Sequence, residues 1–127
     1  MSNSKPSKLL PDNVNFFPAA VEDFLGLDKS QQIKVIKALQ KISKAPSKFG
    51  KELENQAGRP LAGYRSIYVD KKSIRIIWKV TENETIEVAI VAGIAERDGM
   101  LAYKLVSRRK NDFEKFIEHL MKEQNFR

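Results

Sequence analysis

Between Gly63 and Tyr103, cationic side chains are set among apolar and aromatic ones. Arg65, Arg75 and Lys79 lie in segments that are otherwise rich in valine and isoleucine, and Arg97 follows the last of them. An unpaired charge is costly to bury, so these side chains must face solvent, a partner or a ligand. A guanidinium binds phosphate through a fixed fork of donors, and aromatic faces stack on unpaired bases. The pattern predicts a phosphate-binding site, and the interleaved aromatic residues are Tyr64, Tyr68, Trp78 and Tyr103.

Further cations lie outside that stretch. Lys34, Lys37, Lys41 and Lys44 are spaced to share one side of a helix. Such a stripe is ordinarily a solvated face, but it would add salt-sensitive attraction to a nucleic acid. The same two interpretations apply to the cluster at positions 108–110, which comprises Arg108, Arg109 and Lys110.

The composition excludes several kinds of site. The chain has 127 residues and a formal net charge of +7, which suits one domain that attracts polyanions. The absence of cysteine rules out disulfides and thiolate metal sites, and a single histidine, His119, rules out two-histidine catalysis. We expect no metal and no cofactor. The run from Val88 to Ala95 is too short to span a bilayer, so a cytoplasmic protein without a membrane partner is expected.

The cations must be positioned by a small set of elements. Residues 1–12 are predicted to be a flexible arm, and residues 13–127 a single domain. Asp28 and Gln31 form a capping-box pattern before the apolar stripe of a helix that stops before Pro46. A shorter helix precedes it, so the two should form a hairpin. We expect strands at 14–17, 63–69, 73–80 and 86–97, a turn of helix near 51–55, a helical or extended segment at 101–109, and a helix at 111–124 capped by Asn111.

The register of the first two central strands decides whether the cations converge. An even-numbered hairpin loop places Arg65 on the face of Trp78, opposite Arg75 and Lys79. An odd loop or a bulge brings Arg65, Arg75 and Lys79 onto one face. The functional interpretation favours the second arrangement.

The order of these elements resembles the RelE/ParE superfamily of bacterial type II toxins. The resemblance runs from Asn13 to Tyr103 and rests on KISKAP, GYRSIYV, SIRIIWKV and IEVAIVAGIAERD, with a tyrosine beyond. It implies an α+β fold in which a twisted antiparallel sheet of about four strands carries the N-terminal helical hairpin on one face. The helix at 111–124 is additional to that pattern.

The resemblance also implies a function. RelE-like members are ribosome-dependent endoribonucleases that cut mRNA, ParE-like members inhibit DNA gyrase, and both are held inactive by an antitoxin. The residues that match the catalytic pattern are Arg65, Arg75, Arg97 and Tyr103, and Lys79 with the other cations would bind RNA. Ile67 and Ala95 stand where ribonuclease members carry further cations, and Tyr103 lies two residues further from Arg97 than the usual spacing.

Three functions therefore stay open. The first is an mRNA endoribonuclease in which the 2′-hydroxyl of RNA attacks the adjacent phosphate. The second is a non-catalytic gyrase inhibitor, and the third is a basic nucleic-acid-binding protein without toxicity. The expected partners are an acidic, partly disordered antitoxin, the ribosome and mRNA.

Overall fold

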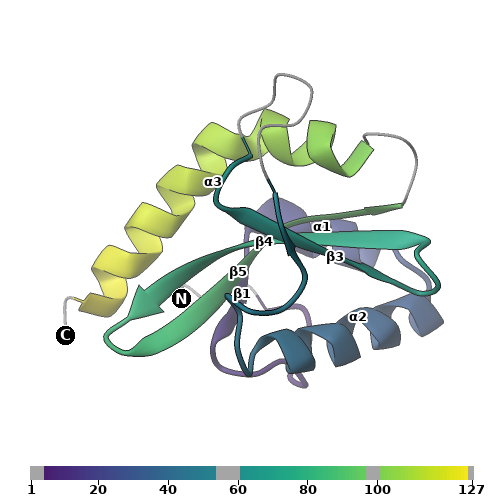
Figure 1. The fold of residues 1–127 in the computed structure, drawn as a ribbon, viewed down its shortest axis with the longest axis horizontal. Coiled ribbons are helices and arrows are strands. Elements are labelled where there is room, and N and C mark those ends of the chain that lie inside the picture. Colours follow the sequence, from purple (N-terminus) through teal and green to yellow (C-terminus); the bar gives the residue numbers. More distant parts are fainter. Residues whose placement is uncertain (1–4, 54–60, 97–100, 126–127) are drawn as a thin grey trace.

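The computed structural model describes residues 5–53, 61–96 and 101–125. In these residues, three helices surround one five-stranded sheet of strand order β1-β5-β4-β3-β2 (Figure 1). The elements in chain order are β1 (Val14–Phe16), α1 (Pro18–Leu25), α2 (Lys29–Ile42), β2 (Lys51–Glu52), β3 (Tyr64–Val69), β4 (Ile74–Asn83), β5 (Ile86–Glu96) and α3 (Leu101–Asn125).

The start of α2 is fixed by local chemistry. Asp28 accepts a hydrogen bond from the Gln31 backbone N–H at 2.8 Å, and the Gln31 side chain accepts one from the Asp28 N–H at 3.2 Å. This reciprocal pair satisfies two N–H groups that the first turn of a helix leaves without partners. The predicted capping box is therefore confirmed.

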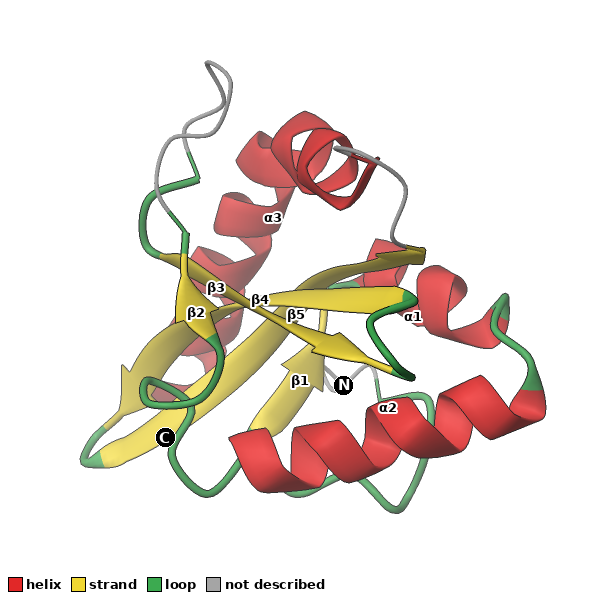
Figure 2. Ribbon diagram, turned by 45° about the vertical axis from the view of Figure 1, so that its right-hand side comes forward, coloured by secondary structure: helices red, strands yellow, loops and turns green. Residues whose placement is uncertain are grey.

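The sheet separates two apolar cores, because side chains alternate between faces along each strand. Figure 2 shows α2 on one side of the sheet and α3 on the other. One face packs with α1 and α2 in what we call the hairpin core, which includes Phe24, Leu39, Ile74, Ile76 and Trp78. The other face packs with α3 in the α3 core, which includes Tyr64, Ile77, Ile90, Val106 and Phe113.

The helix α3 lies unusually close to β5 at Gly93. A Cβ atom at Gly93 would come within 2.9 Å of a methyl carbon of Val106. Glycine therefore lets the helix settle onto the strand, since any larger residue would push Val106 away. This approach sets the position of the first turns of α3, which carry Tyr103.

The α+β class, the twisted sheet, the N-terminal helices and the C-terminal helix are confirmed, with four corrections. The sheet is mixed, because β1 runs parallel to β5. A fifth strand, β2, forms at Lys51–Glu52 where a helical turn was expected. The C-terminal helix begins at Leu101, so Asn111 lies inside it and caps nothing. In the predicted arm, residues 5–12 form no helix or strand, yet Leu10 packs into the hairpin core at 6% exposure.

Candidate anion-binding site

Arg75 is the centre of the candidate site. Its guanidinium carbon lies 4.2 Å from the ring centroid of Tyr68 and 4.5 Å from that of Tyr103. Tyr68 faces Arg75 across β3 and β4, whereas Tyr103 comes from α3. Both distances are within the range of attractive cation–π contacts. No ion pair joins Arg75 to a carboxylate among the described residues, so its donors are available to an anion.

A pocket opens beside this guanidinium. Its volume is about 370 Å³, and Arg75, Tyr68, Tyr103, Ser66 and Lys51 are among the residues that line it. A space of this size is in the range of small-ligand sites. Two cations and two phenols around one pocket can bind a phosphate, stack a base and exchange a proton with a hydroxyl group.

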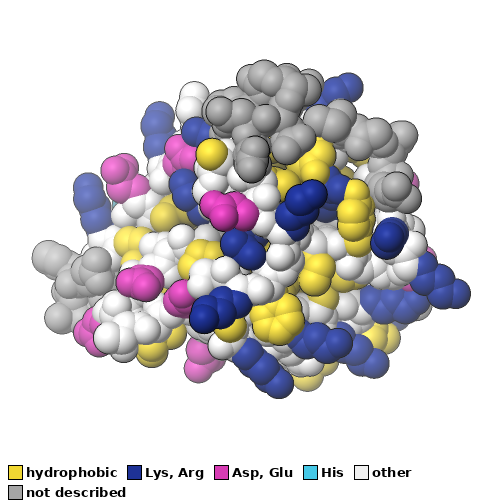
Figure 3. Space-filling view, in the orientation of Figure 1, with side chains coloured by type: hydrophobic (Ala, Val, Ile, Leu, Met, Phe, Trp, Pro, Cys, Tyr) yellow, Lys and Arg dark blue, Asp and Glu magenta, His cyan; other side chains and the backbone are white. Residues whose placement is uncertain are grey.

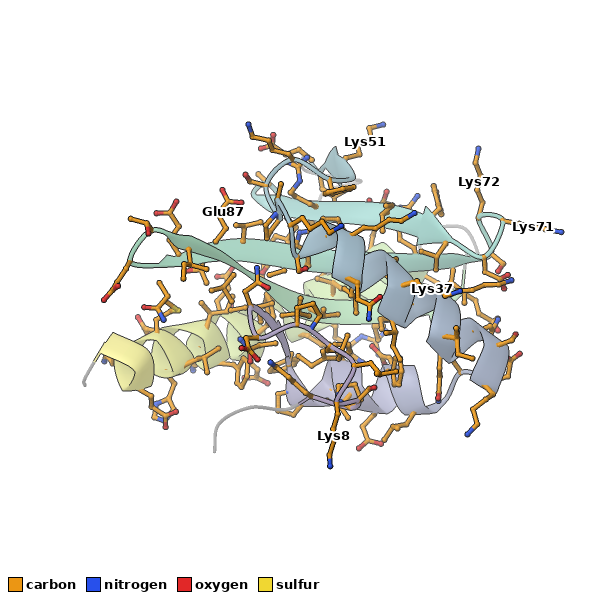
Figure 4. The ribbon with its side chains drawn as sticks, turned by 90° about the horizontal axis from the view of Figure 1, so that it is seen from below. Lys8, Lys37, Lys51, Lys71, Lys72 and Glu87 are labelled. Atoms are coloured by element: carbon orange, nitrogen blue, oxygen red, sulfur yellow. The ribbon has the colours of Figure 1, made fainter. Side chains whose placement is uncertain are left out.

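Lys51 enters the pocket through the register of β2. It pairs with Ser66 of β3, and directly opposite residues extend to the same face of a sheet. That face is the one that carries Tyr68 and Arg75. Figure 4 shows the Lys51 side chain projecting outward from this edge of the sheet. Sequence reasoning missed Lys51, because a strand of two residues has no periodicity to detect.

Arg65 does not line this pocket. It lies opposite Trp78, a residue of the hairpin core, whereas Arg75 lies opposite Tyr68 on the other face. The expectation that Arg65, Arg75 and Lys79 share one face is wrong, because four residues separate β3 from β4 and the loop is even-numbered. The Arg65 side chain donates to the carbonyls of Phe49 at 2.8 Å and Gly50 at 3.3 Å.

Lys79 is on the same face as Arg75 but is held by Glu114. The two side chains lie 3.4 Å apart, Lys110 reaches the same carboxylate at 3.2 Å, and the Tyr64 hydroxyl donates to it at 2.9 Å. Burial raises the pKa of Glu114, but the hydrogen bonds from Tyr64 and Lys110 and the charges of Lys79 and Lys110 outweigh it, so the pKa lies below its usual range. Burial, followed by the hydrogen bond to Glu114, raises the pKa of Tyr64. The Lys79 ammonium is therefore partly neutralised.

Two of the four aromatic residues interleaved with the cations are packed inside the apolar cores. Tyr64 and Trp78 are fully buried, and the Trp78 indole N–H donates to the Pro46 carbonyl at 3.2 Å. Neither ring is open to a base. Tyr68 is 36% exposed, and Tyr103 is partly buried in the first turns of α3.

The lysines of α2 form a surface away from the pocket. Lys34, Lys37, Lys41 and Lys44 are all exposed, and Lys34 is 2.6 Å from Asp70 in the β3–β4 turn. Hydrogen bonds from Lys34 and then Ser73 hold the pKa of Asp70 below its usual range. Figure 3 shows cationic side chains gathered along this side of the molecule, and Figure 4 shows Lys37 on the outer face of α2.

Arg109 has a structural role in this chain. Its guanidinium donates to both Asp23 carboxylate oxygens, at 2.7 Å and 2.9 Å, and to the Ala92 carbonyl at 3.1 Å. The two side chains are 17% and 13% exposed, so this ion pair ties α3 to α1 and β5 away from solvent. Arg109 is therefore not free to bind RNA, whereas Arg108 is exposed. The predicted catalytic residue Arg97 lies outside the described residues.

Within residues 5–53, 61–96 and 101–125, no cluster of three or more histidine or carboxylate side chains could hold a metal ion. Glu87, labelled in Figure 4, accepts hydrogen bonds from the Ser47 hydroxyl at 2.7 Å and its backbone N–H at 3.1 Å, which hold its pKa below the usual range. Of the helices in the described part, none is long and apolar enough to cross a membrane.

The fold is that of the RelE toxins. A double arginine-to-alanine mutant of the E. coli toxin RelE in the free state superposes with a TM-score of 0.59 at 18% identity, covering 76% of this chain and 94% of that one. The RelBE2 toxin–antitoxin complex from Mycobacterium tuberculosis gives a TM-score of 0.53 at 23% identity, with coverages of 71% and 95%. The isolated E. coli RelE toxin gives 0.54 at 16%, with 75% and 95%. No family model matches the sequence, and no curated protein matches it either.

Proposed function

We propose that this chain is the toxin of a type II toxin–antitoxin pair and that it cleaves mRNA on the ribosome at the Arg75–Tyr103 centre. The observation that carries the proposal is the contact between a guanidinium without a carboxylate partner among the described residues and a phenol, beside an open pocket. The RelE fold supports it, because the solved structures with this fold are toxins by name. The site of action is then the cytoplasm.

In this mechanism the nucleophile comes from the RNA. The 2′-hydroxyl attacks the adjacent phosphorus, the bond from phosphorus to the 5′-oxygen breaks, and the products are a 2′,3′-cyclic phosphate and a 5′-hydroxyl. The Arg75 guanidinium offsets the negative charge that develops on the phosphate oxygens. The Tyr103 hydroxyl takes part in transferring the proton from the 2′-oxygen to the leaving 5′-oxygen. Arg97, from the resemblance, would hold the scissile phosphate.

A gyrase inhibitor without catalysis is the second candidate. Two observations favour it: Arg65 is directed to the carbonyls of Phe49 and Gly50, and Lys79 is paired with Glu114. Only one of the three expected strand cations therefore faces the pocket unpaired. A site with one guanidinium still positions a phosphate, so the ribonuclease remains our proposal and the inhibitor the alternative.

The partner we propose is an acidic, partly disordered antitoxin. The chain carries a net charge of +7, and the exposed lysines of α2 offer a surface for carboxylates. One of the structural neighbours is a toxin–antitoxin complex. Co-expression with the product of an adjacent small gene tests this partner, since a stable complex should purify together and relieve growth arrest.

Induction of the protein in a bacterial host separates the functions. A ribonuclease gives growth arrest with new 5′ ends in ribosome-bound mRNA, read by primer extension within minutes. A gyrase inhibitor instead gives loss of plasmid supercoiling and a DNA-damage response with intact mRNA. Normal growth with intact mRNA and normal supercoiling would overturn the proposal. The remaining interpretation would then be a nucleic-acid-binding protein without toxicity.

A further inference from the structure

We propose that Lys51 and Ser66 form a second phosphate subsite, which binds the phosphate next to the one held by Arg75 on a single RNA strand. This inference rests on the proposed function and adds to it a residue that the RelE-like pattern does not supply. Lys51 then supplies the second cation of the pocket, beside Arg75, which Arg65 was expected to supply.

The register of three strands places the subsite. Lys51 of β2 is opposite Ser66 of β3, and Tyr68 of β3 is opposite Arg75 of β4. Ser66 and Tyr68 are two residues apart and so share a face. All four residues line the same pocket of about 370 Å³. Glu52 is opposite Arg65 and also contributes to the lining of this pocket, but among the described residues no ion pair joins it to Lys51.

Ser66 presents a hydroxyl to the pocket. The residue is only 7% exposed, yet its hydroxyl makes no hydrogen bond to any described residue. Ser66 lines the pocket, and its oxygen is not among the fully buried side-chain atoms without a partner in the described residues, so a ligand in the pocket can reach it. A phosphate group in the pocket would accept hydrogen bonds from both the Ser66 hydroxyl and the Lys51 ammonium.

Arg65 acts here as a positioning residue. Its hydrogen bonds to the carbonyls of Phe49 and Gly50 fasten the segment that leads directly into Lys51. Gly50 has a positive φ of 71°, and a Cβ there would overlap the Ser66 carbonyl oxygen. Only glycine permits this close approach of the chain to β3. Arg65 does not line the pocket, but it holds the backbone segment that positions Lys51 there.

The spacing of the two subsites suits one nucleotide step. Ser66 and Tyr68 are separated by about 6.8 Å along β3, at about 3.4 Å per residue, whereas Lys51 and Arg75 start from the strands on either side of β3, each about 4.8 Å away. Arg75 already leans over β3, because its guanidinium lies over the Tyr68 ring. The distance between consecutive phosphates of an extended single strand is similar to the distance between the two subsites along β3. The Lys51 side chain has a flexible four-carbon stem, so its ammonium can follow the phosphate. A single strand laid along β3 would thus place one phosphate at Arg75 and the next at Lys51.

Two short probes test the subsite by direct binding. One is a dinucleoside monophosphate and the other a trinucleoside diphosphate, both 2′-O-methylated so that the nucleophile is blocked. We expect the parent to bind the second probe about tenfold more tightly, since a charge-assisted hydrogen bond is gained. Lys51→Ala should remove most of this gain and lower the slope of log K against log salt by about 0.7, the value for one phosphate on a single strand.

Lys8→Ala is the matched control, because Lys8 is exposed and points away from Lys51 (Figure 4). It should keep the gain, and Lys51→Arg should retain it as well. The inference is overturned if the parent shows no gain, if Lys51→Ala keeps it, or if Lys8→Ala loses it equally. Arg75→Ala separates the two proposals: if it leaves the monophosphate probe bound as tightly, the proposed centre fails, whatever the result at Lys51.

Discussion

Arg65 and Arg75 lie on neighbouring strands and extend from opposite faces of the sheet. Arg75 contacts Tyr68 and Tyr103 on the α3 side, whereas Arg65 reaches backbone carbonyls beside the hairpin core. Two guanidiniums that looked equivalent therefore have different roles, one facing a pocket and the other fastening a strand.

Arg75→Lys keeps the charge but should weaken binding of single-stranded RNA. An ammonium cannot reproduce the planar fork that binds phosphate in two places, nor its stacking on Tyr68 and Tyr103. The loss of one charge-assisted hydrogen bond corresponds to about 1.5 kcal/mol or more, roughly tenfold in affinity. Fluorescence anisotropy with a labelled, cleavage-resistant oligoribonucleotide measures it.

The fold of this variant should be unchanged, because Arg75 is at the edge of a pocket and outside both cores. A thermal unfolding scan checks this point. Equal affinity of the Arg75→Lys variant and the parent would show that phosphate is held elsewhere.

Arg109→Leu should be strongly destabilising. Removing this guanidinium leaves the Asp23 carboxylate with few partners in a nearly buried place, where the side chain is 13% exposed. Breaking a buried ion pair in this way costs about 3–5 kcal/mol. Urea unfolding followed by circular dichroism gives the free energy of unfolding.

The neighbouring residue provides the control. Arg108→Leu removes the same charge from an exposed position and should change stability by no more than about 0.5 kcal/mol. The double variant Asp23→Asn/Arg109→Leu should recover part of the loss, because no unpaired charge remains. If Arg109→Leu instead weakened RNA binding in a protein of normal stability, the structural role would be wrong.

Glu114→Gln should lower stability at neutral pH but not in acid. The pKa of Glu114 is depressed in the folded protein, so the folded state favours the charged form. The stability that this charge contributes is fully present above the ordinary glutamate pKa of about 4.3 and is lost as the pH falls through the lower, folded value. Urea midpoints of parent and variant should therefore differ at pH 7 and converge toward pH 3.

Glu118→Gln, on an exposed position of α3, is the comparison for a charge without this network. The contribution of Tyr64 to stability has the opposite pH dependence, because the pKa of Tyr64 is raised in the folded protein. Its contribution is present below the ordinary tyrosine pKa of about 10 and is lost as the pH rises above it. A difference between Glu114→Gln and the parent that stayed constant from pH 7 to pH 3 would argue against the network.

Much of the fold could be predicted because its signals are local. The capping box of Asp28 and Gln31 is read directly from residue spacing, and the valine- and isoleucine-rich segments mark β3, β4 and β5. The expected proximity of Arg75 and Tyr103 is also found, because the Arg75 guanidinium carbon lies 4.5 Å from the centroid of the Tyr103 ring, whereas their catalytic roles stay a prediction.

The rest depended on interactions that no short pattern carries. The β3–β4 turn contains three consecutive residues with positive φ, Asp70, Lys71 and Lys72, at 54°, 56° and 69°. None is glycine, and each such conformation costs roughly 1–2 kcal/mol, so the sequence predicts a turn here but not its conformation or the strand register that it sets. The Lys34–Asp70 and Ser73–Asp70 contacts that hold it are tertiary or specific to the turn. The strand β2 depends in the same way on Arg65 and Gly50.

The central claim is that the Tyr103 hydroxyl takes part in cutting RNA, and Tyr103→Phe tests it most directly. The single-turnover rate of mRNA cleavage on purified ribosomes, with product ends analysed for 2′,3′-cyclic phosphate, is the measurement. We predict that the variant retains RNA binding, because the ring on Arg75 is preserved, while the rate falls by about a hundred- to ten-thousand-fold. A variant that cleaves as fast as the parent, or a parent whose products lack the cyclic phosphate, would contradict the account.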